Sequence, residues 1–250
     1  VLPNLIKQFT GGDTASASRR AHSVVGAFTA ANAATVVPQE PAPMTATLIV
    51  MGDSVGRGGV ADLYDACVNP VVLVPVKAFA DAKARLAGVL TPAERVALAR
   101  WTAERVIAAA GELPVYVACD NTEVADWAAA HGATVLWHPG VGLNAAVNDS
   151  VADLRSRGVG HVIVAHGDLP RPQSLPAVAL PGTLTLVPDA RGDGTNVAAL
   201  PTDLAFEFAY GAGSFSRHLA QAVAGGVPVA VRRDTLLGLD IDTPTDLTHP

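Results

Sequence analysis

Two aspartates near the end of the chain raise the first chemical question. In the stretch GLDIDTPTDL, residues 238–247, Asp240 and Asp242 are separated by a single residue. Successive side chains of an extended chain point to opposite faces, so these two carboxylates would share one face. Two acids on one face are costly unless a cation lies beside them. The local alternative is that Asp242 caps a short helix beginning at Thr243-Pro244.

Three cations follow the first strand of the regular part of the chain. The segment VPVKAFADAKARL, residues 74–86, carries Lys77, Lys83 and Arg85. For any one of these side chains the ordinary interpretation is a solvated surface charge. Three cations directly after a buried strand favour a clamp for a polyphosphate.

A glycine loop, GVGLNA at residues 140–145, fits the G-x-G-x-x-A pattern of dinucleotide-binding loops. It belongs to the third strand–helix unit, and His161 occupies the place where such folds require an acid. The pattern therefore does not favour a dinucleotide fold. Gly142 can still let a nucleotide approach the backbone, and Asn144 offers an amide able to read a base edge or a ribose hydroxyl.

Two further loops contain glycine beside a hydroxyl. RGDGTN, residues 191–196, is expected to be a loop that carries Thr195, and YGAGSFSRH, residues 210–218, places Gly211 and Ser214 before a helix. Ser214 has the type of an ordinary N-cap. Free amides at a helix start, together with a hydroxyl and a glycine, also make an anion site. Ser214 could fill both roles only if the helix begins slightly later.

Strand-like and helix-like segments alternate from Val71 onward. A capping box of Thr91 and Glu94 marks the first long helix. Strands are predicted over 71–76, 115–118, 134–137 and 161–165, and helices over 91–111, 123–132 and 144–157. The alternation predicts an α/β fold with a mainly parallel sheet and helices on both faces. Ligands bind such sheets at the carboxyl ends of the strands, and Asp168 follows the strand over 161–165.

Composition limits the function classes. The 250 residues are half apolar and carry a formal net charge of -6, which argues against a general nucleic-acid binder. No run is long and apolar enough for a membrane span. The two cysteines, Cys67 and Cys119, form no metal-binding or disulfide motif, which suits a cytoplasmic protein.

The first 69 residues differ in texture from the rest. They are expected to form a poorly ordered or loosely attached extension, with an overlong gene start as its leading explanation, and residues 70–250 are expected to form the catalytic domain. A twin-arginine export signal at Arg19-Arg20 is disfavoured, because the run that follows contains no leucine. The stretch TATLIVMGDSVGRGG, residues 45–59, could add a strand.

Six segments together resemble the guanylyltransferases of deazaflavin coenzyme F-420 biosynthesis, over about Val71 to Leu247. They are VPVKAFADAKARL, GLNAA, GDLP, RGDGTN, YGAGSFSRH and LDIDTPTDL, in this order. That family activates 2-phospho-L-lactate or phosphoenolpyruvate with GTP. The resemblance implies the nucleotide-diphospho-sugar transferase type of fold, shared with molybdenum-cofactor guanylyltransferases. It also implies that Asp168 and Asp240 hold Mg²⁺, and that Thr195, Gly211 and Ser214 grip the phosphate of the acceptor acid.

The chemistry requires little from the protein beyond alignment and charge neutralisation. A phosphate monoester has a second pKa near ~6, so at pH 7 it is largely a dianion and needs no general base. Lys77, Lys83 and Arg85 are expected to neutralise charge as pyrophosphate leaves. Two alternatives remain open: a related transferase that acts on a sugar phosphate or molybdopterin, and a non-catalytic nucleotide-binding module.

Overall fold

The computed structural model describes residues 48–51 and 70–248. The extension predicted over residues 1–69 therefore lies outside the described residues, apart from four of them. These four form strand β1, Leu48–Met51, which pairs in parallel with β8, Val229–Arg232. The sheet thus includes a strand that precedes residue 70, where the catalytic domain was predicted to begin. This strand lies within residues 45–59, the stretch that could add a strand.

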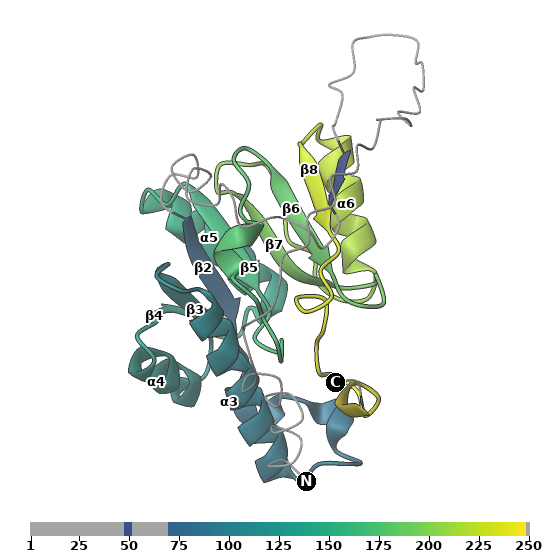
Figure 1. Ribbon diagram of the computed structural model, residues 1–250. Helices are drawn as coiled ribbons and strands as arrows, with labels where there is room; N and C mark the ends of the chain where they lie inside the picture. Colours follow the sequence, from purple (N-terminus) through teal and green to yellow (C-terminus); the bar gives the residue numbers. More distant parts are fainter. Residues whose placement is uncertain (1–47, 52–69, 249–250) are drawn as a thin grey trace, which may run out of the picture.

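Among the described residues the strands form one eight-stranded sheet in the order β1-β8-β6-β7-β5-β2-β3-β4 (Figure 1). Only β7 runs antiparallel to its neighbours β5 and β6. The prediction of a mainly parallel sheet is confirmed. The remaining strands are β2 (Pro70–Pro75), β3 (Val115–Cys119), β4 (Thr134–Trp137), β5 (His161–Ala165), β6 (Leu184–Pro188) and β7 (Thr195–Pro201).

The helices begin and end close to their sequence signals. They are α3 (Pro92–Ala109), α4 (Thr122–Ala130), α5 (Gly142–Ser156) and α6 (Ser214–Ala224). At the start of α3 the Thr91 amide donates to Glu94 Oε2 (2.9 Å) and the Glu94 amide donates to Thr91 Oγ1 (3.3 Å), so the capping box is formed. Helix α5 begins at Gly142, two residues before the predicted start.

Alternate residues of β2 show how the sheet is covered. Val72 and Val74 belong to a buried cluster with side chains of α3 and α4, whereas Val71 and Leu73 belong to a second cluster with side chains of α5 and α6. Side chains of a strand alternate between faces, so the two helix pairs cover opposite faces of the sheet. The prediction of helices on both faces is confirmed.

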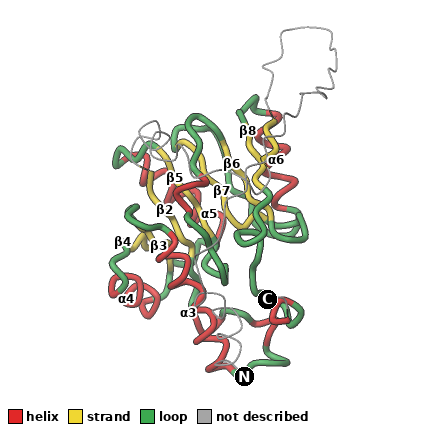
Figure 2. Tube along the Cα trace, in the orientation of Figure 1, coloured by secondary structure: helices red, strands yellow, loops and turns green. Residues whose placement is uncertain are grey.

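The C-terminal segment returns to the edge of the sheet where β5 ends. Figure 2 shows it as a loop that runs down to the segment before α3. Ile241 is buried with Leu86, Leu90 and Leu98, and its amide donates to the Asp168 carbonyl (3.3 Å). No strand forms over residues 238–242, yet Asp240 and Asp242 are both only partly buried while Ile241 is buried. The predicted alternation is therefore present without a strand.

The cap predicted for Asp242 is not formed. The helical turn in this region is Asp246–Thr248, later than predicted, and the Asp246 carboxylate binds the chain before it. Its Oδ2 accepts from the amides of Asp242 (3.0 Å) and Thr243 (2.6 Å). No helix within residues 48–51 and 70–248 is both long and apolar enough to cross a membrane.

Candidate active site

A cleft with a cavity volume of about 410 Å³ opens at the carboxyl ends of the parallel strands. Residues just after four strands line it: Lys77 after β2, Asp120 after β3, His138 after β4, and Asp168 after β5. Gly142, at the start of α5, lies in the same wall. This size and position are typical of a cofactor or nucleotide site in an α/β sheet.

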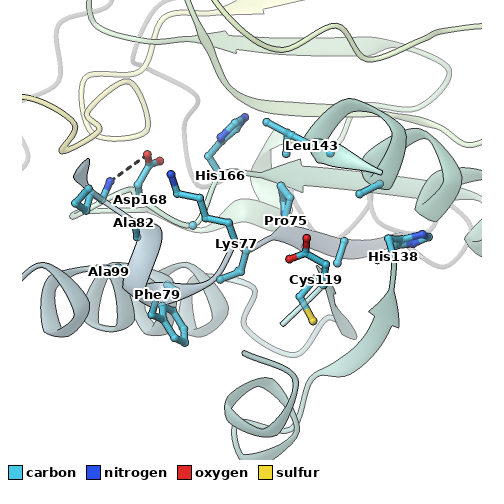
Figure 3. Close-up of a pocket in the computed structure, with 18 of the residues that line it drawn as sticks. Pro75, Lys77, Phe79, Ala82, Ala99, Cys119, His138, Leu143, His166 and Asp168 are labelled. Carbon is cyan, nitrogen blue, oxygen red and sulfur yellow. Dashed lines mark hydrogen bonds and ion pairs between the residues drawn. The ribbon is translucent and has the colours of Figure 1, made fainter. Parts of the chain in front are cut away.

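Lys83 and Asp168 form an ion pair inside this cleft. Lys83 Nζ lies 3.2 Å from Asp168 Oδ2, and the lysine side chain is only 6% exposed. Lys83 has a φ of 57°, a left-handed conformation that costs a non-glycine residue free energy and that often marks a functional site. In Figure 3 the Lys77 side chain also extends toward Asp168 and His166, so two of the three predicted cations line the cleft.

Arg85 does not lie in the cleft with these lysines. Its side chain is 71% exposed and its guanidinium pairs with Asp242 Oδ2 at 2.5 Å. The prediction that three cations converge on one site is therefore not supported for Arg85. A short helical turn, Ala84–Leu86, directs Arg85 toward the C-terminal segment while Lys83 faces inward.

The pKa values of Asp168 and Asp240 are shifted in opposite directions by their surroundings. Burial would raise the pKa of Asp168, but the charges of Lys83 and His166 outweigh it and lower the pKa below its ordinary value. Burial, and then the charges of Asp168, Asp246 and Asp189, raise the pKa of Asp240 to about 7. Asp240 thus lies in an excess of negative charge that a further cation would neutralise.

The hydrogen bonds show which carboxylates have oxygens to spare. Asp189 accepts from the amides of Asp193 and Gly194 (both 2.9 Å), and Asp246 binds Arg191 as well as the amides described above. Within residues 48–51 and 70–248, the Asp240 side chain makes no hydrogen bond or ion pair, whereas Asp168 and Asp242 each pair with a cation through Oδ2. The same part of the chain contains no group of three metal-ligating side chains. A metal here would be held by Asp168 together with Asp240 or Asp242.

The amide of Asn144 is already occupied. Its Oδ1 accepts from the Tyr210 amide (2.7 Å) and its Nδ2 donates to the Tyr210 carbonyl (3.3 Å). Asn148, one turn later on α5, makes the same pair of bonds with the Phe208 backbone (2.8 and 3.2 Å). The structure therefore does not support the predicted contact of Asn144 with a nucleotide, because the amide instead fixes the segment that leads to Gly211.

Thr195 and Ser214 lie together although 19 residues separate them in sequence. Thr195 is the first residue of β7 rather than part of a loop, and its amide donates to Ser214 Oγ (3.1 Å). Both residues are buried, at 3% and 2% exposed. Gly211, in the adjoining turn, is exposed and has a φ of 121°, which only glycine adopts without strain.

The start of α6 differs from the predicted anion site. Gly213 is the N-cap and Ser214 the first helical residue, so the helix begins one residue earlier than a capping serine would require. The first two helical amides are already used: Ser214 donates to the Gly211 carbonyl and Phe215 to the Asp193 carbonyl (both 3.0 Å). The two hydroxyls and the Gly211 turn are therefore the candidate contacts for an anion.

Four residues that face these sites were missed in the sequence. Asp120 and His138 could have been found, since each lies within two residues of the end of a predicted strand and would reach the same edge of the sheet. Asn148 and His218 gave no local signal, because their partners lie 60 and 23 residues away.

Residues 70–249 match the protein family described as guanylyl transferase CofC like. The chain belongs to this family. It is 37% identical over 189 residues to the phosphoenolpyruvate guanylyltransferase of Sphaerobacter thermophilus, covering 72% of this chain and 91% of that protein. It is 35% identical to the protein of the same name from Rubrobacter xylanophilus, covering 71% and 91%. The predicted resemblance and the prediction of a guanylyltransferase are confirmed.

Solved structures agree with the predicted type of fold. A protein from Desulfovibrio desulfuricans G20, described as a nucleotide-diphospho-sugar transferase, matches with a TM-score of 0.58 at 15% identity, covering 72% of this chain and 85% of that one. A nucleotidyl transferase from Methanothermobacter matches with a TM-score of 0.51 at 17% identity, covering 72% and 94%. At these identities the likeness concerns the fold alone.

Proposed function

We propose that this guanylyltransferase moves GMP from GTP to the phosphate of phosphoenolpyruvate and releases pyrophosphate, as a cytoplasmic step of coenzyme F-420 biosynthesis. The proposal rests chiefly on one observation: relatives named phosphoenolpyruvate guanylyltransferase are matched over 91% of their length. The cleft supports it, because a lysine–carboxylate pair lies beside a cavity of nucleotide size. 2-Phospho-L-lactate is the second candidate acceptor.

In the proposed reaction a phosphate oxygen of the acceptor attacks the α-phosphorus of GTP. A new P–O bond joins the two phosphates, and the bond from the α-phosphorus to the bridging oxygen of the pyrophosphate breaks. The acceptor is already a dianion near pH 7, so no proton has to be removed. Lys77 and Lys83 line the cleft and would neutralise the triphosphate as negative charge moves to the leaving group.

Asp168 and Asp240 fit a magnesium ion. Mg²⁺ is usually held by one or two carboxylates, with water and substrate phosphates completing its octahedron. The pKa of Asp240 is raised first by burial and then by the charges of Asp168, Asp246 and Asp189, which a divalent cation would offset. When bound, the ion would stabilise charge on the phosphates during transfer. Asp240 is proposed as the second ligand from its place in the LDIDTPTDL motif, and Asp242, which lines the cleft and pairs with Arg85 through Oδ2, is the alternative.

Thr195, Gly211 and Ser214 are proposed to hold the acceptor's phosphate. The Ser214 hydroxyl accepts from the Thr195 amide, which leaves its own hydrogen to donate. Because both hydroxyls are almost fully covered, this proposal requires the exposed turn at residues 211–213 to move when the acid binds.

The activity is tested by pyrophosphate release with Mg²⁺, using GTP, ATP or CTP against phosphoenolpyruvate, 2-phospho-L-lactate or 3-phosphoglycerate. We expect release with GTP and phosphoenolpyruvate, and a product whose mass equals the acid plus GMP. Release with another nucleotide, or with a sugar phosphate instead of these acids, would contradict the proposal.

Thr195→Val and Ser214→Ala are each expected to raise the apparent KM for phosphoenolpyruvate about ten- to a hundredfold, because each removes a hydrogen bond to a charged group. The KM for GTP should change little. Steady-state kinetics in which each substrate is varied in turn give both constants. A raised KM for GTP with an unchanged KM for the acid would assign these hydroxyls to the nucleotide. Gly211 is a poorer target, since any side chain would strain its backbone.

Asp120 is proposed to select guanine. Its carboxylate lines the cleft after β3, and guanine presents two adjacent N–H donors on its pairing edge, whereas adenine presents one donor and one acceptor there. Asp120→Asn should raise the KM for GTP about tenfold and reduce the preference for GTP over ATP. Asp126→Asn, on the exposed surface of α4, is the matched control. An unchanged nucleotide preference in Asp120→Asn would place base recognition elsewhere.

A further inference from the structure

His218 is a buried histidine whose ring contacts the Thr195 hydroxyl. It projects from α6, is 1% exposed, and is surrounded by the rings of Phe206, Phe208 and Tyr210, whose centroids lie 5.4, 6.0 and 5.3 Å from its own. Burial, and then the charges of Arg217 and His166, lower the pKa of His218 to about 4. The imidazole is therefore neutral near pH 7 and carries one N–H.

The position of that hydrogen follows from the backbone. The Ala209 amide lies 2.9 Å from His218 Nε2. A backbone amide can only donate, so Nε2 must accept and cannot carry the hydrogen of a neutral ring. The hydrogen is therefore on Nδ1, which lies 3.0 Å from Thr195 Oγ1.

This tautomer fixes the direction of the Thr195 hydroxyl. Nδ1–H donates to Thr195 Oγ1, so the hydroxyl accepts there and has its own hydrogen left to donate. Ser214 is in the same state, because its oxygen accepts from the Thr195 amide. Two neighbouring hydroxyls that both accept from the protein form a pair of donors, which is the polarity that an anion requires.

We propose that His218 is a positioning residue that holds the Thr195 hydroxyl as a hydrogen-bond donor toward the phosphate of the acceptor. The inference rests on the proposed function, which places that phosphate at Thr195. His218 does not touch the substrate, and its effect passes through one hydroxyl. The same ring also binds the Ala209 amide, so it ties the donor to the segment that leads into the Gly211 turn.

Two substitutions separate the two bonds of His218. The asparagine nitrogen reaches about the position of Nδ1, so His218→Asn can still donate to Thr195. The glutamine amide reaches about the position of Nε2, so His218→Gln can bind the Ala209 amide but not Thr195. We expect the KM for phosphoenolpyruvate to rise about tenfold in His218→Gln and less than about threefold in His218→Asn, with the KM for GTP unchanged in both.

A double-mutant cycle with Thr195→Val distinguishes positioning from a merely structural role. If His218 acts through the Thr195 hydroxyl, His218→Gln should raise the KM for phosphoenolpyruvate in the parent chain and by less than about twofold in the Thr195→Val chain. Equal factors in both backgrounds would overturn the inference, as would a larger loss in His218→Asn than in His218→Gln. If Thr195→Val alone leaves this KM unchanged, the proposed acceptor site itself is wrong.

Discussion

Replacing Asp168 or Asp240 by asparagine should lower kcat at least about 100-fold, which corresponds to ~2.7 kcal/mol of transition-state stabilisation. Each substitution removes one of the two carboxylates proposed to hold Mg²⁺. Both variants should also bind Mg²⁺ more weakly in calorimetric titrations. Asp242→Asn, which loses only a partly exposed ion pair with Arg85, should keep kcat within about threefold.

The same two variants should differ in stability. As the pH rises from about 4, the ordinary pKa of an aspartate, toward 7, ionisation of Asp240 costs the folded state free energy. Asp240→Asn escapes this cost, so its Tm at pH 8 should exceed that of the parent protein. Asp168→Asn leaves the buried Lys83 ammonium without its partner and should lower the Tm. If both variants lose activity while their Tm values shift in opposite directions, the loss of activity is not caused by loss of stability. Full activity in Asp240→Asn, with loss in Asp242→Asn, would show that the other aspartate holds the metal.

Lys83→Met should lower kcat about 100-fold, because it removes the ammonium that lies 3.2 Å from Asp168 in the cleft. Methionine is also unbranched, so the left-handed backbone at this position bears a similar cost in both proteins. The exposed Arg85→Met is the matched control and should keep kcat within about threefold. Single-turnover measurements at saturating GTP test both variants. Similar losses in the two would mean that the whole segment, rather than Lys83, neutralises the triphosphate.

The strands β2 to β5 and the long helices were readable from the sequence because their signals are local. The capping box of Thr91 and Glu94, and the short apolar runs that became β4 and β5, depend on residues within a few positions of one another. The strands β6, β7 and β8 were not predicted. The RGDGTN segment was expected to be a loop, whereas Thr195 begins the antiparallel strand β7.

The candidate site was only partly readable, for the same physical reason. Asp168 and Lys83 follow the strand or loop signals that predict the ligand edge of the sheet. The destination of Arg85 depended on Asp242, 157 residues away, and that of Asn144 on Tyr210, 66 residues away. A residue type shows what a side chain can bind, but a partner so distant along the chain is determined only by the fold.

Asn144 and Asn148 on α5 bind the backbone of residues 208–210, the segment that leads to the Gly211 turn. Four residues of helix advance about 6 Å and two residues of extended chain about 6.6 Å, so Asn144 and Asn148 match the spacing of Tyr210 and Phe208. The helix therefore gives these backbone groups the bonds that a neighbouring strand would otherwise supply. A chain with its edge satisfied in this way is a poor template for pairing with another molecule. The exposed turn at Gly211, where the acceptor would enter, therefore follows a segment whose backbone is already satisfied.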